Sequence, residues 1–109
     1  MSLYGEYIKE REGKGIVESE VGFATYIFNT DNSCYIVDIY VKPEHRRTRA
    51  AYSLGEQIAF IAKERGCNKL YGSVVPSLKN STESLKFLIA CGFKLDKCQN
   101  DFIVVSREF

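Results

Sequence analysis

The sequence is short of histidine and has no closely paired cysteines, and together these shortages exclude the familiar zinc sites. Its 109 residues include one histidine, His45, and four cysteines, none of them in a Cys-x-x-Cys pair. Zinc motifs need such spacing, so we predict no metal site. Cys34 and Cys91 lie within apolar runs, where cysteine usually behaves as a small buried hydrophobe. We expect reduced thiols, and a catalytic thiol is the less favoured interpretation of either residue.

Long apolar runs and a strong charge bias are also missing. No segment approaches the roughly 20 apolar residues of a membrane-spanning helix, and the N-terminus lacks the regions of a signal peptide. The formal net charge is +1, which argues against a surface devoted to nucleic acid. With 45% hydrophobic residues the chain suits one globular domain. The sequence therefore predicts a single cytoplasmic domain without a membrane segment, a repeat or an interdomain linker.

The alternation of apolar and turn residues predicts a strand-rich N-terminal half and a C-terminal half that contains two helices. From Thr48 the apolar period is helical as far as Gly66, and a second helix runs from a capping box at Asn80 to about Cys91. Turns are expected at 13–15, 29–33 and 97–100. Strands are expected at 4–9, 16–20, 23–28, 34–41, 69–75, 93–95 and 102–106.

These elements predict an α+β (mixed α/β) fold with a central, mostly antiparallel sheet, one parallel βαβ crossover and two main helices. Residues 34–41 form a nearly continuous apolar run and should be the central, well-buried strand. The crossover from Cys34 to Val75 should be right-handed. Ligands of such units gather beyond the carboxyl ends of the strands. We therefore expect a ligand near residues 40–51.

An arginine-rich turn opens the first long helix at that ligand end. Arg46, Arg47 and Arg49 crowd the helix start, where unpaired backbone N–H groups and the helix dipole already carry partial positive charge. The repulsion is easiest to explain if an anion, such as the pyrophosphate of a nucleotide cofactor, lies among the arginines. Arginines that point into solvent would cost little, so this alternative stays open beside the anion site that we favour.

With this strand, turn and helix, residues 34–93 resemble the GNAT N-acetyltransferase family. In that family a valine and a proline end the central strand, as Val41 and Pro43 do here. The next loop has the pattern Arg or Gln, two residues, Gly, one residue, then Gly or Ala, and it cradles the pyrophosphate of coenzyme A. The resemblance implies the same role for residues 46–51.

Two positions depart from the family pattern. Arg46 and Ala51 match the loop, but Arg49 replaces its first glycine, which would let phosphate approach the backbone with no Cβ in the way. Gly92-Phe93 matches the family's second motif, at the end of the next helix. Five residues before that phenylalanine, Leu88 stands where many members have a tyrosine that acts as general acid, and leucine cannot give a proton.

The resemblance implies a binding site for acetyl-coenzyme A at the end of the central strand. Backbone groups of the strand would hold the acetyl group, while the loop and the helix start would hold the pyrophosphate. The cofactor-binding residues implied in this way are Ile39, Tyr40, Val41, Arg46, Arg47, Thr48, Arg49, Ala50 and Ala51.

Two residues are candidates for proton transfer in such a site. Asp38 is the only carboxylate in the central strand, and it either accepts the amine proton, directly or through water, or is a polar residue on a half-solvated face. Tyr40 is the nearest hydroxyl that would replace the missing acid, although aromatic residues in strands more often serve packing. Both interpretations of each residue stay open.

These observations lead to two functions of different kinds. The first is an acetyl-coenzyme A-dependent N-acetyltransferase that transfers an acetyl group to an unidentified amine, on a small molecule or on a protein. The alternative is a catalytically inactive acetyltransferase-like structural or adaptor module, in which Arg49 and Leu88 record the loss of the active site. Nucleic-acid contact through Lys42 and the arginines after it is a third and weaker interpretation, because no wider basic patch accompanies it.

The acceptor side of the predicted domain differs from that of the family. Members usually carry two helices between their first two strands, and these helices form part of the acceptor pocket. This sequence has no convincing helical segment before Thr48, so we expect one GNAT-like domain over residues 1–109 that lacks the usual N-terminal helices. Its acceptor side would be open, or completed by a second subunit in a homodimer or by a partner protein.

Overall fold

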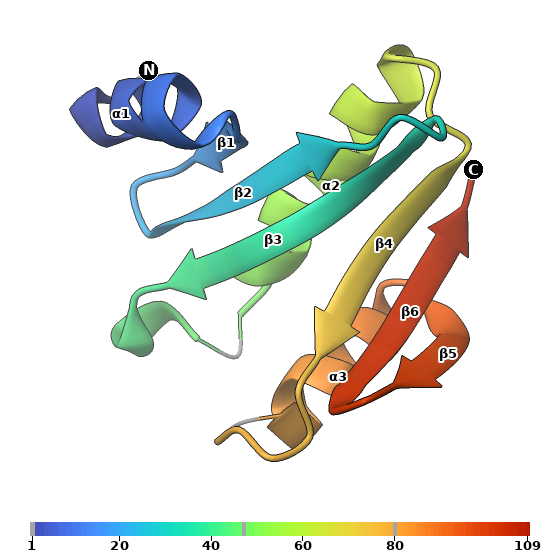
Figure 1. Cartoon of the computed structure of the whole chain (residues 1–109). Helices are drawn as coiled ribbons and strands as arrows, with labels where there is room; N and C mark the ends of the chain where they lie inside the picture. Colours follow the sequence, from blue (N-terminus) through green and yellow to red (C-terminus); the bar gives the residue numbers. More distant parts are fainter. Residues whose placement is uncertain (1, 47, 80) are drawn as a thin grey trace.

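A computed structural model describes residues 2–46, 48–79 and 81–109, and its described part contains a six-stranded sheet with helices packed against it (Figure 1). The elements, in chain order, are α1 (Leu3–Glu12), β1 (Gly15–Glu18), β2 (Gly22–Phe28), β3 (Ser33–Val41), the 3-10 turn η1 (Pro43–His45), α2 (Ala50–Glu64), β4 (Lys69–Val74), α3 (Ser81–Ala90), β5 (Lys94–Gln99) and β6 (Phe102–Glu108).

The sheet has the order β1-β2-β3-β4-β6-β5, which puts β3 near its centre. Neighbouring strands pair antiparallel except β3 and β4, which are parallel and are joined by the crossover helix α2. This arrangement confirms the predicted α+β fold with one parallel pair. A crossover is needed there because a hairpin can join only antiparallel strands.

The parallel pair is short, and the two strands then separate. Pairing of β3 with β4 covers three positions, Ser33 with Lys69, Cys34 with Leu70 and Tyr35 with Tyr71. Figure 1 shows β3 and β4 starting side by side and spreading apart toward their arrowheads. Beyond Tyr35, the β4-facing edge of β3 therefore has backbone groups that no strand pairing with β4 satisfies.

A bulge in β3 decides which of its side chains face the helices. Opposite β2, Thr25 pairs with Asp38 and Tyr26 with Ile36, so Val37 is an extra residue in the ladder. The alternation of faces shifts by one residue at this point. Before the bulge Cys34 and Ile36 face the core, and after it Ile39 and Val41 do. Asp38 and Tyr40 consequently lie on the opposite face, which we call the open face.

The core lies between the sheet and the helices α2 and α3. Buried side chains of α2 (Leu54, Ile58, Ala62) and of α3 (Leu88) belong to one cluster with inward residues of the strands. This confirms the apolar stripe predicted after Thr48. Burial of Leu54 or Ile58 stabilises the fold by about 1.5–3 kcal/mol each. On this side α2 and β6 are also linked by the ion pair of Glu56 with Arg107, at 2.7 Å.

The strand predicted at residues 4–9 is wrong, because this segment belongs to α1 (Leu3–Glu12). The Ser2 side chain caps the helix by accepting a hydrogen bond from the Gly5 N–H at 2.9 Å. Gly13 ends the helix with a positive φ of 66°, a conformation that glycine adopts without strain. Half of the residues between them are charged helix formers, whose propensity a search for apolar alternation overlooks. The expectation that no helical segment precedes Thr48 is wrong for the same reason.

Helix α1 lies at the β1 end of the sheet, and its contacts reach the open face. Ile8 is 3% exposed, and the ring of Tyr4 meets that of Phe23 edge-on at 5.2 Å. The helix precedes β1, and among the described residues none lies between β1 and β2. Part of the open face is therefore covered by one helix that the sequence analysis did not expect.

The turn predicted at residues 97–100 is also misplaced. The segment 97–99 belongs to β5, which pairs with β6 as far as Gln99 opposite Phe102. The polar sequence of β5 concealed this strand, because it is an edge strand whose residues are all exposed. Asn100, with a φ of 53°, and Asp101 make the connection instead.

Candidate functional site

The predicted ligand end is built around the separation of β3 from β4. The end of β3 leads through η1 and the arginine turn to the start of α2. Val41 is buried in the core, Ile39 packs against it, and the side chains of Asp38 and Tyr40 are exposed on the open face. Backbone N–H and C=O groups on the unpaired edge of β3 can bind an extended chain that carries amide groups.

The start of α2 is an electropositive end of a helix. Among the described residues, the first backbone bond of this helix runs from the Ser53 N–H to the Arg49 carbonyl, and the N–H groups of Ala51 and Tyr52 precede it without a partner in the helix. The described residues of its first turn include no acidic side chain to offset the dipole. Ala50 and Ala51 offer small side chains there, and they pack partly against the core. An anionic group fits this helix start.

Arg46 is held at the end of β3 instead of pointing freely into solvent. Its Nε donates a hydrogen bond to the Val41 carbonyl at 3.0 Å, and its guanidinium carbon lies 5.7 Å from the centre of the Tyr40 ring. The Tyr40 ring in turn stacks on Phe23 at 5.7 Å. The structure thus brings Arg46 and Tyr40 together, and the other guanidinium nitrogens of Arg46 are left for an anion.

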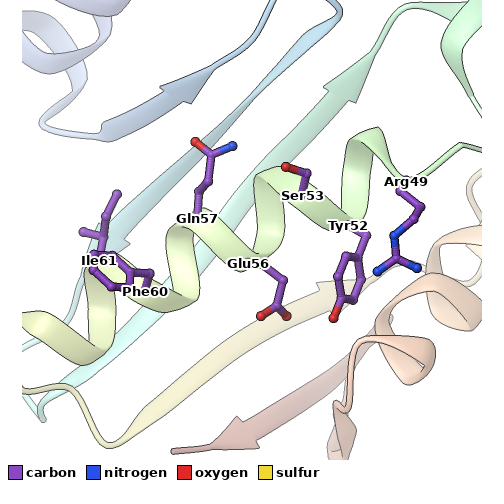
Figure 2. Close-up of a pocket in the computed structure, with 7 residues that line it drawn as sticks. All are labelled: Arg49, Tyr52, Ser53, Glu56, Gln57, Phe60 and Ile61. Atoms are coloured by element: carbon purple, nitrogen blue, oxygen red, sulfur yellow. The ribbon is translucent and has the colours of Figure 1, made fainter.

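Arg49 adopts a different position from Arg46. Its guanidinium carbon lies 4.4 Å from the centre of the Tyr52 ring, and Figure 2 shows the two side chains next to each other along α2. The backbone of Arg49, the N-cap of α2, has a φ of −86°, so an L-residue fits there without strain. The missing family glycine is therefore not needed for backbone conformation, and the obstacle that remains is the Cβ.

A hollow of about 650 Å³ lies along the outer side of α2, beginning at Arg49 (Figure 2). Its lining comes from α2 and its N-cap residue, and Glu56 points to the same side of the helix as Tyr52 (Figure 2). The lining residues are Arg49, Tyr52, Ser53, Glu56, Gln57, Phe60 and Ile61. Phe60, exposed to 66%, makes the far part of this hollow apolar.

Thr48 shapes the loop between η1 and α2. Its hydroxyl donates a hydrogen bond to the His45 carbonyl at 2.7 Å and accepts one from the Ala50 N–H at 3.2 Å. It therefore satisfies one of the free N–H groups at the helix start and fixes the approach of the loop. Arg47, also predicted to bind the cofactor, lies outside the described residues.

The two candidates for proton transfer, Asp38 and Tyr40, share the open face. Lys14, just before β1, is near enough for the charge of Asp38 to affect its pKa. The pKa of the Lys14 ammonium lies above its ordinary value, chiefly because of its hydrogen bond to Glu12, with smaller contributions from Tyr4 and Asp38. The Asp38 carboxylate thus lies at the surface, where Lys14 feels its charge weakly. This position suits a base that exchanges protons with water and equally a solvated polar residue.

Leu88, at the family's tyrosine position, is a packed core residue. It is 7% exposed and belongs to the core cluster. A Cβ added to Gly72 of β4 would lie 3.4 Å from the Leu88 side chain, so α3 sits close against β4 here. The Phe93 N–H bonds to the Leu88 carbonyl after Gly92, whose φ is 90°, so the Gly-Phe motif ends α3.

One pair of residues at the separation of β3 and β4 escaped the sequence analysis. The hydroxyls of Tyr35 and Ser73 are hydrogen-bonded across the two strands, and both residues are partly buried. Tyr35 is the last β3 residue in the parallel ladder, directly opposite Tyr71. Nothing in the sequence marks this pair, because its formation depends on the register of strands that are distant in the chain.

The cysteines behave as buried structural thiols, with one exception. Burial, with a smaller effect of Cys67, raises the pKa of the Cys34 thiol to about 12. Burial also raises the pKa of Cys91, with a smaller effect of Glu56. These thiols hold their protons at neutral pH and are poor nucleophiles. Cys98, on β5, is exposed.

The chain matches the sequence model of the Acetyltransferase (GNAT) family over residues 4–93. This match covers most of the 109 residues, and the chain therefore belongs to the GNAT acetyltransferase family. No curated protein sequence matches it. Within the described residues, the structure contains no helix that is both long and apolar enough to cross a membrane.

Solved structures of acetyltransferases have the same fold. The Bacillus subtilis acetyltransferase in complex with coenzyme A has a TM-score of 0.77 at 15% identity, over 95% of this chain and 83% of that chain. The PaiA N-acetyltransferase of Thermoplasma acidophilum, also in complex with coenzyme A, has a TM-score of 0.76 at 17% identity, over 98% of this chain and 69% of that chain. A GNAT-family acetyltransferase of Staphylococcus aureus has a TM-score of 0.74 at 14% identity, over 99% of this chain and 80% of that chain. At such identities the likeness establishes the fold.

Proposed function

We propose that the protein is an acetyl-coenzyme A-dependent N-acetyltransferase whose acetyl donor lies between β3 and β4. The observation that carries this proposal is the end of the β3–β4 ladder at Tyr35, which leaves an unpaired strand edge beside the start of α2. Membership of the GNAT family supports it. So does the coenzyme A in the Bacillus subtilis and Thermoplasma acidophilum structures.

The residues at the separated end of β3 fit the parts of coenzyme A. The pantetheine arm is an extended chain with amide groups, and the backbone of Ile39, Tyr40 and Val41 provides the matching strand edge. The pyrophosphate would bind the free N–H groups at the start of α2, beside Ala50 and Ala51. Its remaining partners would be the guanidinium groups of Arg46 and Arg47, with Thr48 fixing the loop and Arg49 forming the N-cap of α2.

The reaction that this arrangement supports is direct attack of an amine on a thioester. Acetyl-coenzyme A would supply the activated acetyl group, and the chain would contribute positioning and a backbone N–H donor for the carbonyl oxygen. Asp38, exposed on the open face, would accept the amine proton directly or through water. The ring of Tyr40, between Phe23 and Arg46, supports a role in holding the loop more than a role as acid.

The acceptor amine would reach the site from the open face. Helix α1 covers this face at its β1 end, through the contact of Tyr4 with Phe23. The part around Asp38 stays exposed, so an amine carried on a protein can approach as well as a small molecule. A second copy of the chain or a partner protein would complete the acceptor side if the amine is small.

A calorimetric titration with acetyl-coenzyme A tests this function. We expect saturable binding of one molecule per chain. Arg46→Ala should weaken it by about 10- to 100-fold, because a charged hydrogen bond to phosphate contributes roughly 1.5–3 kcal/mol. Arg11→Ala, at an exposed arginine in the last turn of α1, removes the same charge away from the site and serves as the matched control.

Two results would contradict the proposal. The first is absence of binding to a protein shown to be free of co-purified coenzyme A. The second is an equal loss of affinity for Arg46→Ala and Arg11→Ala, since this would indicate only the general attraction of a cation for an anion.

Two observations favour a second function, that of an inactive acetyltransferase-like adaptor. Leu88 is packed into the core where the family's tyrosine acid would be, and Arg49 occupies a glycine position. An adaptor would transfer no acetyl group, whether or not it binds coenzyme A. Thiol release from bound acetyl-coenzyme A in the presence of an amine distinguishes the two functions.

A further inference from the structure

The hydroxyl pair of Tyr35 and Ser73 occupies the point where β3 and β4 separate. Tyr35 closes the parallel ladder opposite Tyr71, and Ser73 lies two residues further along β4, on the same face as Tyr71. The Tyr35 hydroxyl meets the Ser73 hydroxyl across the widening gap. The pair therefore lies where the closed part of the sheet ends.

The pair also belongs to the open face, from which an acceptor would arrive. In β3, Cys34 and Ile36 face the core, so Tyr35 between them points to the opposite side. Asp38 follows on that same side after the bulge at Val37. Two hydroxyls that share one hydrogen bond still have one O–H to donate and several lone pairs to accept. The pair can therefore both accept and release a proton.

The proposed position of the acetyl donor brings its reacting end toward this pair. From Val41 back to Tyr35 the strand spans six residues, or about 20 Å. An extended arm that enters beside the start of α2 and follows β3 cannot pass Tyr35, because the ladder to β4 is closed there. Its thioester end would consequently point toward Tyr35 and Ser73.

We propose that Tyr35 and Ser73 receive the acceptor amine and carry away its proton. This inference rests on the proposed function. The amine nitrogen, oriented by a hydrogen bond to the pair, forms a bond to the acetyl carbon, and the carbon–sulfur bond breaks. The proton leaves the nitrogen through the two hydroxyls and reaches Asp38 through water, Asp38 releases it to solvent, and the coenzyme A thiolate takes a proton from water. Protons balance, and no further reactant is needed.

A structural clamp is the competing role for the same hydrogen bond. A hydroxyl bond between two strands can serve only to hold the ladder end, and its loss would then lower stability by about 0.5–1.5 kcal/mol. Such a clamp would have no reason to respond to the acetyl group of a bound ligand. A probe on Tyr35 itself therefore separates the two roles.

The first experiment uses fluorine NMR of the full chain labelled with 3-fluorotyrosine, with the Tyr35 resonance assigned through Tyr35→Phe. The protein is titrated with acetyl-coenzyme A and, separately, with coenzyme A. We expect the Tyr35 resonance to shift with both and to reach different end points, because only one ligand carries the acetyl group. Saturable binding by calorimetry with an unmoved Tyr35 resonance would overturn the inference and leave the proposed function standing. Absence of binding would overturn both.

The second experiment measures thiol release from acetyl-coenzyme A with spermidine and with a lysine-containing peptide as amines. Tyr35→Phe and Ser73→Ala should each lower kcat by about 10- to 100-fold while KM for acetyl-coenzyme A changes less than about twofold. The double variant should be no slower than the slower single variant, because the two hydroxyls act as one unit. Tyr71→Phe, the neighbouring tyrosine opposite Tyr35, is the matched control and should keep its kcat.

Three outcomes of this second experiment would overturn the inference. They are an unchanged kcat in Tyr35→Phe, an equal loss in Tyr71→Phe, and a wild-type protein that binds acetyl-coenzyme A but transfers to neither amine. The third outcome would also favour the adaptor function.

Discussion

The two ends of β3 differ in what surrounds them, although one strand makes both. At its start, Ser33 and Cys34 are buried and pair with β4, and Cys34 also pairs with Phe28 of β2. At its end, β4 has moved away, and the exposed side chains of Asp38 and Tyr40 alternate with core residues. The closed end supports the fold, and the open end supplies a strand edge, a helix start and charged side chains.

This difference indicates where a sheet can bind a ligand at little cost in stability. The edge of a strand that has lost its neighbour presents backbone donors and acceptors, which must find partners in water or in a ligand. The bulge at Val37 marks the change, since it re-aims the side chains after it. If this account is right, changes at the closed end alter stability and changes at the open end alter binding.

Removal of a core side chain at the closed end should have the largest effect. Leu70 of β4 is almost fully buried and pairs with Cys34. We expect Leu70→Ala to lower the free energy of unfolding by about 2–5 kcal/mol, because it leaves a cavity. Asp38→Asn, at the open end, should change it by less than about 0.5 kcal/mol. Urea denaturation measures the free energy of unfolding of both variants. Similar losses in the two would contradict the proposed difference between the ends of β3.

Restoring the family's tyrosine should damage the fold more than it helps catalysis. Leu88 is buried and packs against Gly72 of β4. We expect Leu88→Tyr to cost about 1–3 kcal/mol through overpacking, with no gain in thiol release from acetyl-coenzyme A. Denaturation and thiol release are measured on the same variant. A stable protein with faster turnover would show that the site was designed for an acid on α3.

Replacing Arg49 by glycine should have a smaller effect, at the open end. Since the guanidinium of Arg49 lies on Tyr52 and its φ is ordinary, we expect its Cβ to be the main obstacle to phosphate. Arg49→Gly should then bind acetyl-coenzyme A about threefold more tightly, or by roughly 0.6 kcal/mol. Calorimetry measures the change. Weaker binding would instead indicate that Arg49 itself grips the phosphate.

Alkaline pH should weaken the closed end slightly through Cys34. Its thiol keeps its proton to a pKa of about 12 in the folded chain but loses it near 9 when unfolded. The folded state therefore binds more protons between these values, so stability falls as pH rises above about 9. Urea denaturation at several pH values should show a shallower decline for Cys34→Ala than for the wild type. Equal slopes would exclude this contribution.

Much of the fold follows from the sequence because its signals are local. The apolar stripe of α2, the run of β3 and the Gly92-Phe93 ending of α3 each lie in one continuous segment, and the structure confirms them. Helix α1 was missed because it buries few side chains, so charge and capping define it instead of periodicity. The edge strand β5 was shortened for a similar reason.

The site was harder to predict because it depends on how strands sit together. Arginines at a helix start are visible in the sequence, and so is the departure at Leu88. The bulge at Val37, which puts Asp38 and Tyr40 on the open face instead of the core face, is not visible. Neither is the contact of Tyr35 with Ser73, because it needs the register of β3 against β4.

The most direct test of the account is an NMR titration of the backbone amides of the isotope-labelled chain with acetyl-coenzyme A. We predict saturable shifts of the amide signals of Ile39, Tyr40 and Val41 at one molecule per chain, together with those of Ala51 and Tyr52. Binding that leaves these signals unmoved, and instead shifts those that line the hollow along α2 near Phe60, would contradict the claim that the open end of β3 holds the ligand.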